Sequence, residues 1–264
     1  MQKNKLSVVI ITYNEEANIE ACIASVRGLA DEILVVDSHS TDRTAEIAEN
    51  IGATVLFHDF EGHIQQKNWA KSKALYDYVL SLDADERLSS ELYQSILSEK
   101  EKGFPLNGYS FNRLNHLKQR PIKGCGWYPD RKLRLWNKNS GEWTGTNPHD
   151  RFELHEGCSE TSLTGDLIHY TYPTYRSVFK QAVKFGKIGA KSVGATESTL
   201  KLLFKFLTSP HIKFIKNYIL KGGFLYGFRG LYICLCQWLE SLIKYSSALL
   251  FVLIEALSFI DIWG

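Results

Sequence analysis

Acidic side chains at the ends of apolar runs are the residues of this chain best suited to chemistry. Asp83 and Asp85 stand one residue apart, directly after the apolar run 78–82. Two carboxylates at this spacing can hold a hard cation and the diphosphate that the cation neutralises. Oxygen ligands of this kind suit Mg²⁺ or Mn²⁺. The alternative is that both acids only solvate a strand end or cap the next helix, where Ser89 and Ser90 are better caps.

Asp37 is a second candidate for contact with a ligand. It ends the apolar run 33–36 and lies beside a Ser-Thr-Asp turn, where its carboxylate could accept hydrogen bonds from a nucleobase imide or a ribose hydroxyl. Its alternative role is that of N-cap for the following helix. Ser40 and Thr41 could supply that cap instead, so we favour ligand contact.

Strands that alternate with helices must position these acids. The apolar, largely β-branched run 6–11 is typical of a parallel strand that is covered on both faces. Asn14 is a plausible N-cap for the helix that follows. We expect further strands at 33–36, 54–57 and 78–82, and helices at 44–51 and 65–75. This alternation predicts an open α/β sheet, in which ligands bind beyond the carboxyl ends of the strands.

The second half of the chain has a different character. Residues 103–172 are rich in Trp, Arg, Asn and Gly, as expected of irregular strands and loops that build a second pocket. From Tyr175 a helical pattern returns, with basic residues stepping by three or four along one face: Arg176, Lys180, Lys184, Lys187 and Lys191. Residues 167–239 hold eleven Lys and Arg against one acid, and the rest of the chain holds 20 basic and 28 acidic residues. Two kinds of partner are therefore expected.

Length and composition exclude some classes of protein. With 264 residues, of which 44% are hydrophobic, the chain can fill a core, so disorder is not expected. Five cysteines without a CxxC pair argue against a disulfide framework or a zinc knuckle and indicate reduced thiols. The first apolar run ends at Ile11 and no signal-peptide pattern follows, so we expect the catalytic part to stay in the cytosol.

Four segments in order carry a resemblance to a known family. They are SVVIITYNEE (7–16), ILVVDSHSTDRT (33–44), QQKNWA (65–70) and YVLSLDADE (78–86). This array closely resembles the family 2 glycosyltransferases of GT-A fold, over about the first 90 residues. The resemblance implies that Thr12, Asn14 and Asp37 line a nucleotide pocket. It also implies that Asp83 faces the ribose and that Asp85 coordinates the metal. Gln66 and Lys67 are assigned to the same nucleotide-sugar site.

Three later segments look like the subgroup that adds glucose to the heptose of the lipopolysaccharide core. They are WYPDRKLRLWN (127–137), WTGTNPHDRFE (143–153) and LTGDLIHYTYPTY (163–175), and residues 210–230 resemble the tail of the same subgroup. The subgroup usually shows His-Glu where this chain has His149-Asp150, a shorter acid with a different reach. We predict that Asp150 is the general base, because an inverting displacement needs one carboxylate to remove the acceptor proton. The alternative is a surface acid beside Arg151.

Other side chains are candidates for contact with the diphosphate or the acceptor. His169 could close over the diphosphate. Arg131 and Arg134, which we expect to share a strand face, could bind a phosphate. Trp127 and Trp143 could stack on sugar rings. Each has a structural alternative. His169 could be a structural histidine, the two arginines could be solvated surface charges, and the two tryptophans could pack in the core.

The last part of the chain has the composition of a surface that lies on anionic lipid. Residues 199–264 mix aromatic and aliphatic side chains with lysines, and the charge-free runs 231–239 and 245–254 fall short of the ~20 residues that cross a bilayer. We expect a catalytic domain over 1–172, made of a nucleotide-sugar half (1–102) and an acceptor half (103–172). A helical, membrane-associated extension (173–264) follows. The alternative is that these helices pack on one another or on a second copy.

The combined prediction is an inverting hexosyltransferase that is peripheral on the inner face of the cell membrane. The resemblance implies UDP-glucose as donor and a lipid-linked saccharide as acceptor, and we expect no nucleic-acid partner; a homo-oligomer stays possible. One rival is a sister enzyme that glycosylates a polyprenyl phosphate, whose oxyanion needs no strong base. A dinucleotide-binding dehydrogenase is a second rival, although no G-x-G-x-x-G follows the first strand. A third is a non-catalytic membrane adaptor that keeps the fold.

Overall fold

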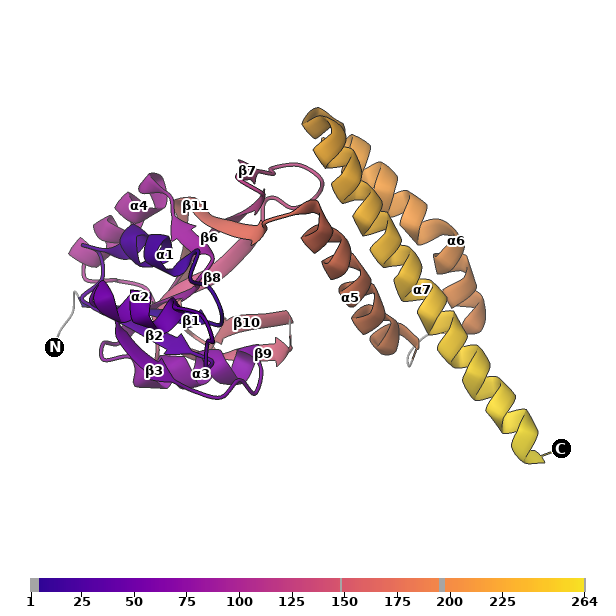
Figure 1. The fold of residues 1–264 in the computed structure, drawn as a ribbon, viewed down its shortest axis with the longest axis horizontal. Helices are drawn as coiled ribbons and strands as arrows, with labels where there is room; N and C mark the ends of the chain where they lie inside the picture. The colour runs from indigo at the N-terminus through magenta and orange to yellow at the C-terminus, as the bar shows by residue number, and fades with distance from the viewer. Residues whose placement is uncertain (1–4, 148, 195–197, 264) are drawn as a thin grey trace. The chain divides into compact units, whose positions relative to one another are not determined.

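The computed structural model describes residues 5–147, 149–194 and 198–263, which form two compact units (Figure 1). Unit 1 contains Met1–Leu114 and Pro129–Thr171. Unit 2 contains Asn115–Tyr128 and Tyr172–Gly264. The predicted nucleotide-sugar half therefore lies in unit 1. The segment Asn115–Tyr128, which falls in the expected acceptor half (103–172), belongs to the same unit as the C-terminal helices.

The elements of unit 1 follow the predicted alternation. The parallel strands and their helices are β1 (Leu6–Thr12), α1 (Ile19–Val26), β2 (Glu32–Asp37), α2 (Thr44–Asn50), β3 (Thr54–Phe57), α3 (His63–Lys73) and β4 (Tyr78–Asp83). They are followed by β5 (Glu86–Leu88), α4 (Ser90–Glu101), β6 (Gly108–Leu117), β7 (Arg120–Pro121), β8 (Arg131–Asn137), β9 (Gly141–Thr146), β10 (His149–Leu154) and β11 (Glu160–Tyr172). Strands β6 and β11 continue into unit 2, to which β7 belongs.

The sheet confirms the predicted α/β fold. Among the described residues its order is β3-β2-β1-β4-β8-β6-β11-β5, with β7 paired to β6. β1 pairs in parallel with β2 and β4, and β2 pairs in parallel with β3. β8 then pairs antiparallel with β4 and β6, while β9 and β10 form a separate hairpin. The irregular second half of the sequence therefore extends the same sheet beyond its parallel part.

Strand β1 is buried on both faces, as its apolar run predicted. Val8 and Ile10 belong to one cluster, which also takes in α1, α2 and α4. Val9 and Ile11 belong to a second cluster with α3 and the β9–β10 hairpin. Because successive strand residues point to opposite faces, this alternation places the sheet between two layers. Each fully buried aliphatic side chain stabilises the layers by about 1.5–3 kcal/mol, so the carboxyl ends of β1, β2 and β4 are held firmly.

The predicted N-cap at Asn14 is wrong. α1 begins at Ile19, with Asn18 in the N-cap position, while Asn14 has a φ of 54°, in the left-handed region that Asn tolerates better than most residues. The Asn14 N–H donates to Ser40 Oγ at 2.8 Å, and the Asn14 Oδ1 accepts from the Thr41 N–H at 2.8 Å. Asn14 therefore joins the loop after β1 to the loop after β2.

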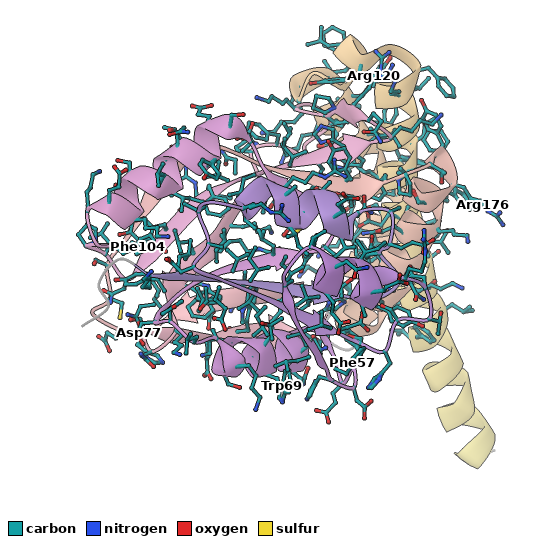
Figure 2. The ribbon with its side chains drawn as sticks, turned by 60° about the vertical axis from the view of Figure 1, so that its left-hand side comes forward. Phe57, Trp69, Asp77, Phe104, Arg120 and Arg176 are labelled. Atoms are coloured by element: carbon teal, nitrogen blue, oxygen red, sulfur yellow. The ribbon has the colours of Figure 1, made fainter. Side chains whose placement is uncertain are left out.

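Unit 2 consists mainly of helices. They are α5 (Tyr175–Gly194), α6 (Thr199–Ile215), the short turns η1 (Lys216–Leu220) and η2 (Gly223–Tyr226), and α7 (Gly227–Trp263). α5 has the predicted basic face, since Arg176, Lys180 and Lys184 are exposed, and Arg176 points away from the ribbon (Figure 2). The opposite face of α5 buries Val178 and Ala182 in a cluster that contains residues of α7. All five cysteines, which lie in the described part of the chain, are free thiols.

No helix in the described ranges is by itself long and apolar enough to cross a membrane. One bent pair, Thr199–Leu220 with Gly223–Val252, meets that test by length and composition when its two parts are taken together, across a bend of 68°.

Candidate active site

The register of the parallel strands gathers the predicted acids at one edge of the sheet. Thr12 of β1 pairs with Asp37 of β2, and Ile11 pairs with Asp83 of β4. A cavity of about 530 Å³ opens at this edge. It is lined by Ile11, Thr12, Tyr13, Glu15, Ser38, Phe60, His63, Gln66, Asp83, Ala84, Asp85 and His169. Five of the predicted site residues are in this lining, which is where α/β sheets bind ligands.

Asp37 is fully buried beside the lining residue Ser38. Its Oδ1 accepts from the Ser40 N–H at 2.6 Å. Its Oδ2 and the Thr12 Oγ1 are buried and have no hydrogen-bond partner among the described residues. Buried polar atoms are nearly always paired, so both atoms remain open to a hydrogen bond from a group outside the chain. Asp37 does not cap α2, which begins at Thr44 after the N-cap residue Arg43.

Asp85 and His169 approach each other on the wall of the cavity. The Asp85 Oδ2 lies 3.1 Å from the His169 Nε2, and the other ring nitrogen of His169 lies 2.7 Å from the Thr171 Oγ1. Thr171 therefore orients the imidazole. A carboxylate oxygen and an imidazole nitrogen are a donor pair that Mn²⁺ accepts, and the carboxylate also suits Mg²⁺. Within the described ranges no three His, Cys, Asp or Glu side chains form a group that could hold a metal ion.

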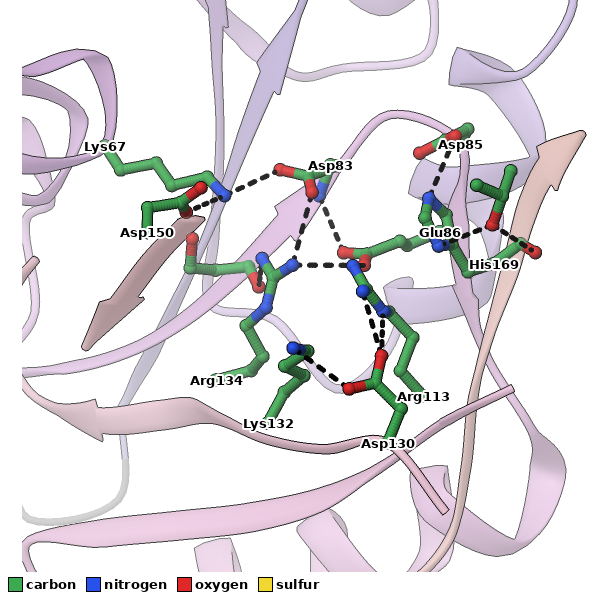
Figure 3. Close-up of polar contacts among 12 residues, drawn as sticks. Lys67, Asp83, Asp85, Glu86, Arg113, Asp130, Lys132, Arg134, Asp150 and His169 are labelled. Atoms are coloured by element: carbon green, nitrogen blue, oxygen red, sulfur yellow. Dashed lines mark hydrogen bonds and ion pairs between the residues drawn. The ribbon is translucent and has the colours of Figure 1, made fainter. Parts of the chain in front are cut away.

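Asp83 faces cations on both sides (Figure 3). Its Oδ1 lies 3.3 Å from the Lys67 Nζ and its Oδ2 lies 3.2 Å from an amino group of Arg134. Its N–H donates to the Glu86 Oε2 at 2.9 Å. Burial alone would raise the pKa of the Asp83 carboxyl, but the charges of Lys67 and Arg134 hold that pKa far below its usual range. Asp83 is therefore ionised at every physiological pH.

Arg134 lies at an irregularity between β8 and β6. Tyr109 pairs with Leu135 and Ser110 pairs with Leu133, so Arg134 has no residue opposite it. Its guanidinium lies 3.1 Å from the fully buried Glu86. Arg131 is exposed, whereas Arg134 is buried, so the two arginines have different surroundings although they lie on the same strand.

Asp150 enters the site through Lys67 (Figure 3). The Lys67 Nζ lies 2.8 Å from the Asp150 Oδ2 and therefore bridges Asp150 and Asp83. Burial would raise the pKa of Asp150, but the charge and hydrogen bond of Lys67 lower it overall. The alternative pairing with Arg151 is not observed, because Arg151 pairs with Glu153 on the protein surface. The side chain of His149, the other member of the predicted motif, lies outside the described residues.

The two tryptophans predicted to contact sugar pack against other aromatic rings. Trp143 is buried against Phe152 and Trp136, and the Lys67 Nζ lies 4.6 Å from its ring centroid. Trp127 belongs to unit 2, where it stacks on Tyr172. Core packing therefore accounts for Trp143, and Trp143 acts on the site by shaping the surroundings of Lys67.

Several residues of the site carried no clear signal in the sequence. Phe60 and His63 line the cavity from the loop before α3 and its first turn, where no periodic pattern precedes them. Glu86 stands directly after Asp83-Ala84-Asp85, and its position in that motif was the one available signal. Its burial against Arg134 requires β4 and β8 to be neighbours, which the sequence pattern does not reveal.

Comparison with known proteins gives a consistent result. A family model described as glycosyl transferase family 2 matches residues 7–150. An uncharacterized glycosyltransferase of Rickettsia bellii is 49% identical to this chain, over 86% of this chain and 80% of that protein. The lipopolysaccharide core biosynthesis glycosyltransferase LpsC of Rhizobium meliloti is 28% identical, over 86% of each chain. Among solved structures, Staphylococcus aureus TarS matches 69% of this chain and 39% of its own length, with 18% identity and a TM-score of 0.47.

Proposed function

The chain belongs to glycosyl transferase family 2, and on that premise we propose that it moves glucose from UDP-glucose to a hydroxyl of a lipid-linked saccharide, in the assembly of a lipopolysaccharide core. The observation that carries the proposal is one cavity at the carboxyl edge of the sheet. Asp83, Asp85 and His169 line it, and Lys67 links Asp83 to Asp150. The choice of glucose and of a core saccharide is supported by the subgroup motifs and by the relationship to LpsC.

In this proposal the donor nucleotide binds where buried polar atoms lack partners. The Thr12 Oγ1 and the Asp37 Oδ2 would accept hydrogen bonds from the base or the ribose. Gln66 holds the neighbouring wall in place, because its amide nitrogen donates to the Ser38 Oγ at 3.0 Å and its Oε1 lies 2.7 Å from the His58 Nδ1. Lys67 would balance the charge of the diphosphate.

Asp85 and His169 would hold a divalent cation, either Mg²⁺ or Mn²⁺. Their donor atoms already converge at 3.1 Å on the cavity wall, where Asp85 is partly exposed and His169 is buried. A bound cation of this kind would supply charge neutralisation for the departing diphosphate.

Asp150 would act on the acceptor. As the acceptor oxygen forms its bond to the anomeric carbon, its proton passes to the Asp150 carboxylate. The bond between that carbon and the diphosphate oxygen breaks at the same time, and the configuration inverts. Lys67 favours this role by keeping Asp150 ionised before the reaction.

A thermal-shift panel of nucleotide sugars, each with and without Mn²⁺, tests the proposal. A donor that binds only the folded chain at about 100 times its Kd stabilises it by about 2.7 kcal/mol. We expect UDP-glucose to raise Tm most, and more with Mn²⁺ than without it. Asp85→Asn should remove the effect of Mn²⁺, whereas Glu153→Gln, a surface change on β10, should leave it intact. An unchanged Tm across the whole panel would refute the proposal.

We also propose that the protein is peripheral on the inner face of the cell membrane, where a lipid-linked acceptor is accessible. Support comes from unit 2, in which many large apolar side chains of α6 and α7 are exposed among lysines. Cell fractionation checks this location. The protein should sediment with membranes, and recovery of all the protein in the supernatant would contradict the proposal.

A further inference from the structure

The turn between α6 and α7 displays large apolar side chains to solvent. We define the tip segment as residues 219–228, at the end of unit 2 where η1 and η2 meet. Leu220 is 76% exposed, Leu225 is 74% exposed and Phe228 is 70% exposed, and Ile219 and Phe224 are each more than half exposed. A single exposed apolar residue is ordinary, but five within ten residues mark a surface that contacts something apolar.

The tip segment is an ordered turn and not an unpacked loop. The Lys221 C=O accepts from the Cys125 N–H at 3.1 Å, and the Tyr226 hydroxyl accepts from the Lys123 N–H at 3.0 Å. Gly222, with a φ of 64°, allows the backbone to turn here. A Cβ atom on Gly230 would lie 1.8 Å from the carbonyl oxygen of Gly223, so the interior of the turn has room only for glycine. The large side chains are therefore held outside.

Paired polar side chains lie directly behind the tip segment. Asn217 donates to the Gln237 Oε1 at 2.8 Å, and Gln237 donates to the Cys125 C=O at 3.0 Å. Further back, the Lys213 Nζ lies 3.3 Å from the Glu240 Oε1. The α7 partners come in reverse order, so the chain runs out along α6 and back along α7, which pack side by side within unit 2 (Figure 1). These pairs satisfy the polar groups that an apolar medium would otherwise penalise.

The charge around the tip segment selects the kind of partner. Residues 198–239 contain six Lys and Arg and no Asp or Glu. Lys221 is exposed in the tip segment, Lys216 is exposed just before it, and Lys123 is exposed on the loop that contacts it. A second copy of this surface would bring like charges face to face, which is unfavourable. An anionic lipid leaflet offers an apolar interior and negative headgroups together, and so fits both features.

We propose that the tip segment is a re-entrant wedge that inserts into an anionic lipid leaflet at the boundary between headgroups and acyl chains. Leu220, Leu225 and Phe228 enter the acyl region, while Lys216 and Lys221 bind lipid phosphates. The chain enters and leaves on the same side of the membrane. This inference rests on the membrane location proposed above and does not depend on the transfer reaction.

Co-sedimentation of the full chain with vesicles tests the wedge. We expect binding to vesicles of phosphatidylcholine with phosphatidylglycerol and weaker binding to phosphatidylcholine alone. Leu225→Glu and Phe228→Glu should each lower the partition coefficient by about tenfold or more, because each loses the burial of a large apolar side chain. Leu75→Glu, at a site that is 66% exposed in unit 1, is the matched control and should bind like the unmodified chain.

A charge variant and two further readouts make the test decisive. Lys216→Glu with Lys221→Glu should weaken binding to the anionic vesicles by about tenfold or more, since each lysine near such a surface contributes about fivefold. Stabilisation of the variants by a nucleotide sugar, measured separately, reports on folding and on the proposed transferase site. Unchanged vesicle binding in Leu225→Glu and Phe228→Glu would overturn the wedge whatever the donor result. If the unmodified chain is a dimer in sedimentation velocity and these variants are monomers that still bind vesicles, the surface would belong to a contact with a second copy instead.

Discussion

Lys67 is the side chain through which the carboxylates of the site influence one another. A buried ammonium is costly unless it is paired, and Lys67, 4% exposed, is paired with both Asp83 and Asp150. The same charge holds down the pKa of both acids. Lys67 therefore influences the protonation of the predicted base, Asp150, and also contacts Asp83, which lines the cavity.

Replacing Lys67 by Met should move the acid limb of the pH profile of kcat/KM to higher pH. The pKa of Asp150 is lowered in the folded chain, so the base stays ionised as the pH falls. Without the lysine charge, burial raises this pKa, and the active ionised form is lost at a higher pH than before. Lys71→Met, one turn further along α3, is the control and should leave the limb in place. Coincident acid limbs for Lys67→Met and the unmodified enzyme would contradict this account.

Asp150→Asn should lower kcat by about 10²–10⁴-fold, because general base catalysis contributes about that factor. Donor binding, measured by thermal shift, should persist, since Asp150 is not among the residues that line the cavity. Steady-state kinetics with the acceptor supply the measurement, with Glu153→Gln as the control on the same strand. Full activity of Asp150→Asn would favour an acceptor that is already an oxyanion, such as a polyprenyl phosphate.

At the scale of elements, one glycine determines how closely β11 approaches α4. A Cβ atom on Gly165 would lie 2.2 Å from the backbone nitrogen of Leu92, at a φ of 91°. Gly157 has a similar φ of 83° but nothing within 4 Å of such an atom. The two positions thus share the backbone strain of a positive φ and differ in available space.

Gly165→Ala should therefore lower the free energy of unfolding by about 1–3 kcal/mol more than Gly157→Ala. Both variants bear the strain of a positive φ, and the additional loss in Gly165→Ala comes from overpacking against α4. Urea denaturation of both variants measures the difference. His169 lies on β11, so the shifted strand should also weaken stabilisation by Mn²⁺. Equal unfolding free energies for the two variants would show that β11 and α4 can separate without cost.

The parallel part of unit 1 was predictable because each of its elements has a local pattern. The expected strand 54–57 matches β3, and those at 33–36 and 78–82 match β2 and β4 to within a residue at either end. The carboxyl ends of parallel strands lie at one edge of the sheet, where ligands bind. Asp83 and Asp85, which follow such a strand, could therefore be predicted as site residues from the sequence. The pairing of Arg134 with Glu86 was not predictable, because it depends on which antiparallel strand lies beside β4 and on an irregularity in β8. Asn14 was misplaced because its bonds to the β2 loop are non-local.

At the scale of the whole molecule, charge is divided between the two units. Unit 2 holds 15 Lys and Arg against four acids, a net charge of +11. Unit 1 holds 16 against 25, a net charge of −9, so the total of +2 conceals the division. Net charge alone therefore gives a poor description of the electrostatics of this chain.

A cation exchanger should retain the protein even at a pH equal to its sequence pI of about 8.2, where the net charge is close to zero. Retention then comes from unit 2 and should be released by salt. Lys216→Glu with Lys221→Glu should lower the eluting salt concentration more than Lys73→Glu with Lys102→Glu, which makes the same charge change in unit 1. The division of charge between the units would be contradicted if both double variants lowered the eluting salt concentration equally, or if the unmodified protein were not retained.

The bonds that Asn14 makes across two loops have a consequence for how the donor is received. With Asn14 bound to Ser40 and Thr41, and the Glu15 N–H donating to the Thr44 Oγ1 at 2.8 Å, this wall of the pocket is assembled before any ligand arrives. Binding of the proposed donor should then cost little conformational entropy, because the donor would order nothing there. The amides of Asn14, Glu15 and Thr41 should exchange slowly with deuterated solvent in the ligand-free protein. Fast exchange that slows only with donor present would mean that the nucleotide builds this wall itself.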